Sequence, residues 1–181
     1  MLKDFSIRIL FDAPCGDFNW MRQVLSEIDI RYIGADVVYP LIASLNEKYG
    51  DGTTSFIHAD LTVDKFPNAD LMICRDCLFH LSFQDAELVL RNFLSSGIPY
   101  LLTSTYVNKG AFLNKDIRTG EFRLIDLFAS PFNFPRDPLL SIDDWVPPHP
   151  ERQMCLWSRT QIEGVLASFN AALTCPRRSN Y

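Results

Sequence analysis

The chain has 181 residues, of which 48% are hydrophobic and 22% are charged, as expected for one globular domain with its own core. Its net charge of -5 argues against nucleic acid as the main partner, because phosphate binding needs a basic face. No apolar run approaches the roughly 20 residues of a membrane helix, so we expect no membrane association.

The cysteines and the N-terminal residues indicate where the protein works. No signal peptide precedes the first predicted strand. An odd number of cysteines, five, without such a signal favours reduced thiols and a cytoplasmic location. Cys74 and Cys77 form a C-x-x-C pair, but no second ligand pair lies at a suitable spacing, so we expect no metal site.

Residues 7–28 have the order strand, acidic residue, tight turn and helix. An apolar run ends in Asp12, a turn with Pro14 and Gly16 follows, and residues 19–28 carry apolar side chains at helical spacing. This order is typical of a nucleotide-binding α/β unit, in which backbone N–H groups at the helix N-terminus face a ligand. The turn matches neither a Walker loop nor the dinucleotide fingerprint G-x-G-x-x-G.

The next elements continue the alternation of strands and helices. Residues 31–36 form a short apolar run that ends in Asp36, where nucleotide folds place an acid that binds the ribose hydroxyls. A helix over 39–49 and a strand over 53–58 follow, and then comes the pair Asp60-Leu61. Ligands of open α/β sheets bind at this carboxyl edge of the strands.

The fourth predicted strand, 69–74, is almost continuously apolar, which is typical of a strand buried on both faces of a parallel sheet. If a helix opens at Asp76, then Asp76 and His80 share one face of it, four residues apart. An amphipathic helix over 83–96 and a strand over 98–104 complete this part of the chain.

Residues 105–152 hold six of the eleven prolines, which disfavours long regular helices. We expect an irregular cap over a substrate, although most of its aromatic residues are better explained as core residues. The segment 122–128 fits either a strand or extended chain. Polar groups that suit a hydroxylated or anionic small substrate are Asn114, Asp116, Arg123 and Asn133.

The C-terminal part, 153–172, is expected to hold one last strand and one last helix. The strand lies within 152–159, and the helix over 160–169 begins at Thr160, with Glu163 at the third helical position to complete a capping box.

Two motifs resemble class I S-adenosylmethionine (SAM)-dependent methyltransferases over about residues 7–104. The family motif D-x-G-x-G-x-G corresponds to Asp12, Pro14, Gly16 and Phe18, with two of the three glycines replaced. Asp76 and His80 match the acid and the histidine that follow the fourth strand in sequences such as E-V-L-E-H-L. The resemblance implies one α/β domain with a Rossmann-like, doubly wound, mostly parallel seven-stranded sheet. It also implies an antiparallel strand near the C-terminus, for which 154–158 is the candidate.

The resemblance also implies the roles of single residues. Asp60 would bind the adenine amino group and the N–H of Leu61 a ring nitrogen. The full set of expected cofactor residues is Asp12, Pro14, Gly16, Phe18, Asn19, Trp20, Asp36, Asp60, Leu61 and Arg75. His80 is the expected general base, with the alternative that it only packs under the cofactor. Asp76 would orient His80 or bind the amino group of the methionine moiety. Metal-dependent catalysis is disfavoured, because Phe79 replaces the second acid of E-x-x-E-H.

These observations predict a SAM-dependent methyltransferase that acts on a hydroxyl oxygen of a sugar-like or related small molecule. One alternative is a non-catalytic SAM-binding or partner subunit with the same fold. An NAD-dependent oxidoreductase is a weaker alternative, because the glycine fingerprint and a Tyr-x-x-x-Lys pair are missing. The sequence leaves room for a homo-oligomer.

Overall fold

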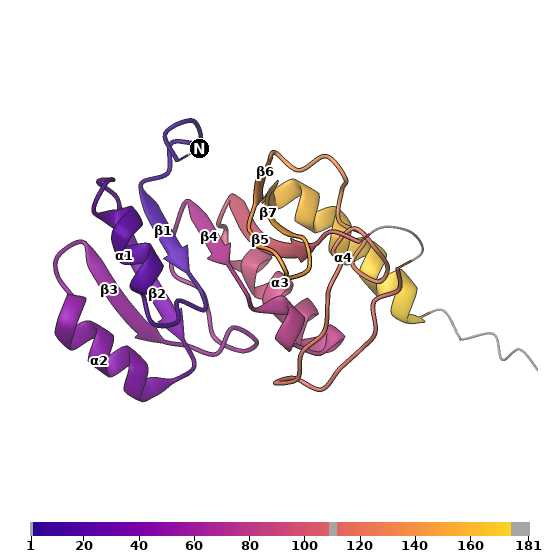
Figure 1. The fold of residues 1–181 in the computed structure, drawn as a ribbon, viewed down its shortest axis with the longest axis horizontal. Helices are drawn as coiled ribbons and strands as arrows, with labels where there is room; N and C mark the ends of the chain where they lie inside the picture. Colours follow the sequence, from indigo (N-terminus) through magenta and orange to yellow (C-terminus); the bar gives the residue numbers. More distant parts are fainter. Residues whose placement is uncertain (1, 109–111, 175–181) are drawn as a thin grey trace, which may run out of the picture.

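A seven-stranded sheet forms the centre of the protein in a computed structural model that describes residues 2–108 and 112–174 (Figure 1). The strand order is β3-β2-β1-β4-β5-β7-β6. The strands are β1 (Ile9–Asp12), β2 (Arg31–Asp36), β3 (Thr54–His58), β4 (Leu71–Cys74), β5 (Tyr100–Tyr106), β6 (Leu140–Asp143) and β7 (Arg152–Ser158). The helices are α1 (Asn19–Leu25), α2 (Tyr39–Tyr49), α3 (Phe83–Ser96) and α4 (Arg159–Thr174).

The pairing of the strands confirms the predicted fold class. The first five strands in the chain pair in parallel, whereas β7 runs antiparallel between β5 and β6. The chain moves outward from β1 to β3, returns to β4 on the other side of β1 and continues to β5. It then forms β6 at the edge and returns to β7 between β5 and β6. The order of strands therefore reverses between β1 and β4, which is where open α/β sheets bind their ligands.

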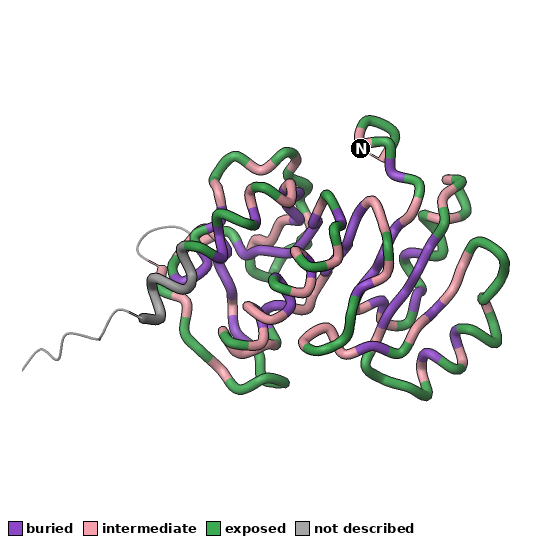
Figure 2. Tube along the Cα trace, turned by 180° about the vertical axis from the view of Figure 1, so that it is seen from behind, coloured by how far each residue is buried: buried purple, intermediate pink, exposed green. Residues whose placement is uncertain are grey.

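The two faces of the sheet bury two separate clusters of apolar side chains. Strand β4 shows this alternation, because Met72 and Cys74 belong to the cluster under α3 and α4, and Leu71 and Ile73 to the cluster under α1 and α2. All four residues are buried, as predicted for a strand covered on both faces. Figure 2 shows the buried residues concentrated along the strands and on the inner sides of the helices.

The segment predicted to be an irregular cap is partly core and partly strand. Ile125, Leu127 and Phe132 are fully buried, and Tyr106 N–H donates to the Ile125 carbonyl, so this stretch packs beside β5 without forming a strand. Strand β6 lies within the same segment and was not predicted. Its four residues are mostly exposed. Buried and exposed positions do not alternate along it, so its sequence carries no strand pattern.

The helix boundaries agree with the sequence where strong local signals exist. Helices α2 and α3 span the predicted residues, and α3 begins with Asp85 N–H donating to the Ser82 side chain and ends at Gly97 with φ 82°. Helix α1 is shorter than predicted and ends at Leu25. None of the helices in the described part of the chain is long and apolar enough to cross a membrane.

Helix α4 begins one residue before the predicted start, and a different residue caps it. Gln161 N–H donates to Ser158 Oγ at 3.3 Å, and Ser158 N–H donates back to Gln161 Oε1 at 2.9 Å. This reciprocal pair is a capping box, so Ser158 and not Thr160 is the N-cap. Glu163, which was expected to complete the box, instead pairs with Arg159 at 3.2 Å.

Candidate functional site

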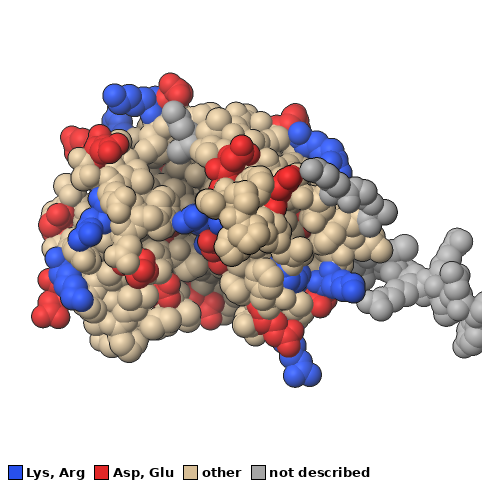
Figure 3. All heavy atoms as spheres, in the orientation of Figure 1, with Lys and Arg blue, Asp and Glu red and all other residues tan. Residues whose placement is uncertain are grey.

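An acidic hollow of about 240 Å³ lies at the carboxyl ends of β1, β2 and β4. Four of its nine lining residues are aspartates. The lining consists of Asp12, Pro14, Cys15, Gly16, Asp17, Trp20, Asp36, Arg75 and Asp76. The hollow lies where the strand order reverses, and seven of these nine residues were predicted to bind a cofactor or to act in catalysis. Figure 3 shows acidic and basic side chains interspersed over the face drawn there.

The turn after β1 is held against the end of β2, which brings Gly16 to Asp36. Cys15 N–H donates to the Ala35 carbonyl at 2.7 Å, and Gly16 N–H donates to Asp36 Oδ2 at 3.3 Å. Gly16 has φ +53°, and a Cβ built on it would meet no atom within 4 Å. The glycine is therefore needed for its left-handed backbone, and the space beside it stays open to a ligand.

Phe18 is a core residue, and its expected contact with a cofactor stays a prediction. Its ring is 3% exposed and packs on the rings of Tyr32, Tyr49 and Phe56. Its φ of 63° is the left-handed conformation that the glycine of the family motif adopts without strain. The phenylalanine keeps this backbone conformation because its ring is buried against the three others.

Asn19 also lies outside the lining of the hollow. Its backbone N–H and its side-chain amide both donate to the Asp17 carboxylate, at 3.1 and 2.7 Å. Asp17 therefore satisfies the first N–H of α1, and the seven-residue helix gives no independent reason to expect a ligand at its N-terminus.

Asp12 is the most buried carboxyl group of the hollow, with 1% of its surface exposed. Burial raises its pKa from 3.8 to about 7, against the opposing effects of the hydrogen bond from Tyr32 Oη and the charge of Arg75. At neutral pH this group is therefore close to its titration point. A positive ligand in the hollow would favour the carboxylate form.

Four charged residues form a network of ion pairs beside the hollow. Arg75 binds the Asp144 carboxylate through two nitrogens, at 2.9 and 3.1 Å. Arg152 bridges Asp144 at 3.0 Å and Asp76 at 2.7 Å. The network joins the two residues after β4 to Asp144, which follows β6, and to Arg152, the first residue of β7, so these four residues fix one side of the site.

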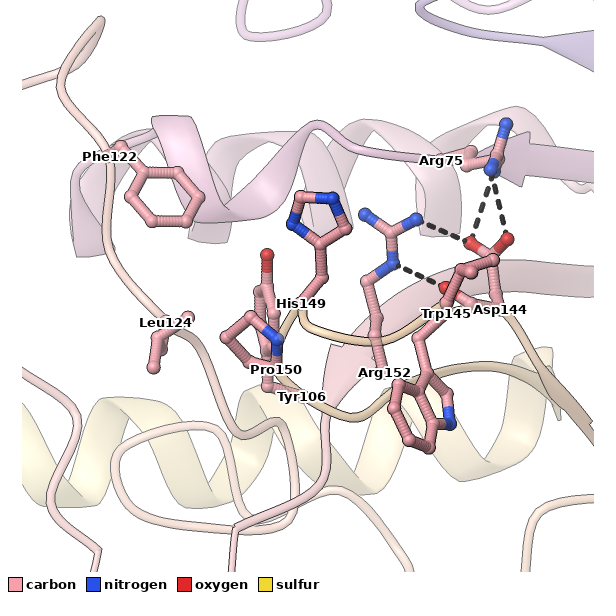
Figure 4. Close-up of a pocket in the computed structure, with 10 residues that line it drawn as sticks. Arg75, Tyr106, Phe122, Leu124, Asp144, Trp145, His149, Pro150 and Arg152 are labelled. Carbon is pink, nitrogen blue, oxygen red and sulfur yellow. Dashed lines mark hydrogen bonds and ion pairs between the residues drawn. The ribbon is translucent and has the colours of Figure 1, made fainter.

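A second, larger cavity of about 680 Å³ adjoins the acidic hollow, and Arg75 lines both. We call it the aromatic cavity. Its lining consists of Arg75, Tyr106, Phe122, Leu124, Asp144, Trp145, Val146, His149, Pro150 and Arg152 (Figure 4). Of these residues, the sequence had indicated only Arg75 for the site. The run Trp145-Val-Pro-Pro-His149 was the one sequence signal for this cavity. Its prolines exclude a helix, so Trp145 and His149 must lie on a loop before a strand.

Asp76 and His80 do not share a helical face, which corrects that prediction. Asp76 has φ 54°, only a short 3₁₀ turn covers Leu78–His80, and α3 begins at Phe83. The His80 ring lines neither cavity. Its Nδ1 lies 2.9 Å from the Glu121 carbonyl oxygen. The left-handed residue turns the chain, so the spacing of four no longer brings the two side chains together.

Asp60 and Leu61 follow β3, at the same edge of the sheet as Asp36, but they do not line the acidic hollow. The Asp60 carboxylate accepts from the backbone N–H and the hydroxyl of Thr62, at 2.8 and 2.7 Å. Leu61 packs against the core, and its carbonyl accepts from the Asn92 amide. Their expected role at the adenine ring stays a prediction.

None of the four residues predicted to bind a substrate lines the aromatic cavity, namely Asn114, Asp116, Arg123 and Asn133. Asn114 holds the loop, since its amide donates to the Asp126 carbonyl and accepts from Asp126 N–H. Arg123 is 6% exposed, lies 3.6 Å from Asp116 and stacks on Phe83. These contacts stabilise the loop packing, and the expected role of the four residues in substrate binding stays a prediction. Within the described residues, no group of three or more His, Cys, Asp or Glu side chains could hold a metal ion.

Comparison with known proteins gives a fold and no family. No family model matches the sequence, and no curated protein matches it. Among solved structures, a Burkholderia thailandensis 1,6-didemethyltoxoflavin-N1-methyltransferase, solved with its substrate and S-adenosylhomocysteine, has a TM-score of 0.64 at 18% identity, over 87% of this chain and 73% of that one. Human N-acetylserotonin methyltransferase in complex with SAM has a TM-score of 0.60 at 12% identity, over 84% of this chain and 48% of that one.

A third similar structure, described as a pericyclic reaction enzyme, has a TM-score of 0.63 at 10% identity, over 83% of this chain and 43% of that one. The chain therefore spans less than half the length of two of these three proteins. At such identities the similarity establishes the Rossmann-like fold of SAM-dependent methyltransferases, and the chemistry of this chain has to be argued from its own side chains.

Proposed function

We propose that this protein is a SAM-dependent methyltransferase that acts on a small molecule. The observation that carries the proposal is the acidic hollow, in which four aspartates and one arginine gather where the strand order reverses. Two of the similar structures were solved with SAM or S-adenosylhomocysteine, which supports the same cofactor here.

The charges of the hollow suit SAM better than NAD. SAM carries a positive sulfonium, a positive ammonium group and a ribose diol, all of which pair well with carboxylates. The pyrophosphate of NAD is negative and would lie against the same four aspartates, with Arg75 as the one cation among the lining residues. The oxidoreductase alternative is therefore disfavoured by electrostatics as well as by the missing glycines.

Five of the lining residues, and two residues after β3, then have roles that fit their positions. Asp36 would accept hydrogen bonds from the ribose hydroxyls, and Gly16 leaves room for the ligand beside it. Asp12 and Asp76 would face the positive groups, with Arg75 near the carboxylate of the methionine part. Asp60 and the N–H of Leu61 would bind the adenine ring. When bound, SAM supplies a methyl group on a good leaving group.

The acceptor would bind in the aromatic cavity, because this cavity shares Arg75 with the acidic hollow. The residues of the cavity would align the acceptor and exclude water, which is the main requirement for an in-line transfer. We keep a hydroxyl oxygen as the methylated atom. A sugar-like acceptor has less support, since the four polar residues that suggested it lie outside the cavity.

Isothermal titration with S-adenosylhomocysteine, with NAD as the control ligand, tests the proposal. We expect micromolar binding of S-adenosylhomocysteine alone. Asp36→Ala should weaken it at least about tenfold, because charge-assisted hydrogen bonds to the ribose are lost. Asp29→Ala is the matched control, since this exposed aspartate precedes the opposite end of the same strand and should change affinity less than twofold.

Two results would contradict the proposal. Absence of S-adenosylhomocysteine binding to the wild-type protein removes the cofactor assignment. Equal affinity of the wild type and Asp36→Ala removes the ribose role of Asp36. Binding without turnover of any acceptor would instead favour the non-catalytic subunit.

A further inference from the structure

The aromatic cavity has the size and the walls of a binding site for a flat organic molecule. Its volume of about 680 Å³ lies in the range of small-molecule sites. The walls come from β5 through Tyr106, from the chain beside it through Phe122 and Leu124, and from residues 145–150 (Figure 4). Three separate parts of the chain thus bring apolar side chains around one space.

The charged groups of this cavity, Arg75, Asp144 and Arg152, are already partnered. Arg75 and Arg152 both bind Asp144, and Arg152 also binds Asp76. A ligand that relied on these arginines would have to break ion pairs that hold the site together. The apolar walls can be used without that cost, so we expect recognition by ring stacking more than by charge.

Large apolar side chains remain exposed around the opening. Phe122 is 57% exposed, Trp145 38% and Val146 70%. Aromatic and aliphatic groups that converge on a cavity while staying in contact with water mark a ligand site. Tyr106, Phe122 and Trp145 offer ring faces and edges, which bind planar aromatic rings better than puckered ones.

His149 is the one imidazole among the lining residues of the aromatic cavity. Figure 4 shows its ring between Tyr106, Phe122 and the guanidinium group of Arg152. The charged groups that share its wall are Arg75, Asp144 and Arg152. Histidine is the side chain best suited to take a proton near neutral pH, whereas His80 lies outside this cavity with its Nδ1 beside a backbone carbonyl.

We propose that the acceptor is a planar aromatic or heteroaromatic molecule with an acidic O–H group, and that His149 receives its proton. This inference rests on the proposed function and names the acceptor class and the base for the same reaction. The acceptor hydroxyl gives its proton to a ring nitrogen of His149, and its oxygen forms the bond to the methyl carbon. The carbon–sulfur bond breaks with its electron pair left on sulfur, so a neutral thioether and a protonated imidazole result.

4-Nitrophenol is a suitable probe, because its phenolate absorbs in the visible range and the neutral phenol does not. We would titrate it into the wild-type protein with and without S-adenosylhomocysteine at one fixed pH. The bound probe should be more ionised than the free probe at that pH, since His149 accepts its proton. This readout needs no turnover.

The variants separate binding from proton transfer. His149→Gln should return the ionised fraction of the bound probe toward that of the free probe, with affinity changed less than about threefold. Trp145→Ala should weaken binding at least about fivefold through loss of ring contact. Leu113→Ala is the control, because this leucine is 77% exposed, lies outside the lining and should change affinity less than twofold.

The outcomes decide between the alternatives. Preferential binding of glucose over 4-nitrophenol, or equal affinity of Trp145→Ala and the wild type, would overturn the aromatic acceptor. His149 is not the base if the ionised fraction of the bound probe is the same in His149→Gln as in the wild type. The same conclusion follows if His80→Gln lowers that fraction and His149→Gln does not. If S-adenosylhomocysteine binds and the probe does not, only this inference fails. If S-adenosylhomocysteine does not bind, the proposed function fails first.

Discussion

Replacing Asp12 by asparagine should make the protein more stable at neutral and alkaline pH while it weakens cofactor binding. Asp12 is buried, and its pKa in the folded state is about 7, against 3.8 in the unfolded chain. Between these two values the folded state keeps a proton that the unfolded state has already released. The free energy of unfolding must therefore fall as the pH rises from about 4 to about 7.

The size of this effect follows from the two pKa values. At about 1.4 kcal/mol for each pKa unit, the difference between 3.8 and about 7 corresponds to about 4 kcal/mol of stability lost by pH 8. Asparagine has a similar shape, can still accept the hydrogen bond from Tyr32 Oη and has no charge to lose. The stability of Asp12→Asn relative to the wild type should thus rise by about 4 kcal/mol between pH 4 and pH 8.

Urea unfolding of both proteins at a series of pH values measures this difference. A difference that stays constant with pH would show that Asp12 titrates normally and that the argument from burial is wrong. Tyr32→Phe gives an independent check, because removing the hydrogen bond should raise the pKa of Asp12 further and extend the loss of stability to higher pH. Affinity for S-adenosylhomocysteine should fall in Asp12→Asn, so the substitution raises the free energy of unfolding and weakens ligand binding.

Two further predictions concern residues whose roles were predicted from the sequence. Phe18→Ala should destabilise the protein by about 3–5 kcal/mol, since a buried ring is lost and the left-handed backbone stays. Its affinity for S-adenosylhomocysteine, measured where the variant is folded, should change less than threefold. A large loss of affinity with little loss of stability would place Phe18 in the cofactor site. Ser158→Ala should cost about 1 kcal/mol in urea unfolding through loss of the cap of α4. Thr160→Ala, the matched control, should cost less, and the reverse order would restore the predicted cap.

The sheet and most helices could be predicted because their signals are local. Helix α3 has a capping serine, an apolar stripe and a terminal glycine, and its predicted bounds agree with the structure. Strand β4 is apolar at every position, which identified it as central. Strand β6 lacked such a pattern, because it is short and largely exposed at the edge of the sheet.

The acidic hollow was largely predictable as well, because the ends of parallel strands meet at one edge whatever the loops do. Asp12 ends β1, Asp36 ends β2 and Asp76 follows β4. The structure brings all three to one hollow. The motif alignment did not reveal that Phe18 is buried, since a sequence position in a motif does not show whether its side chain points outward or into the core.

The sequence by itself therefore determined most of the strands and helices and the edge of the sheet at which the acidic residues gather, since both depend on periodicity and on neighbouring residues. Only the tertiary structure decided which side chains form the aromatic cavity. Three of its residues, Tyr106, Phe122 and His149, are far apart in the chain. They meet because contacts between distant residues fix the path of the loops, such as the hydrogen bond that Arg123 N–H donates to the Phe79 carbonyl. The left-handed turn at Asp76 likewise keeps Asp76 and His80 from sharing one helical face, and no spacing rule contains that turn.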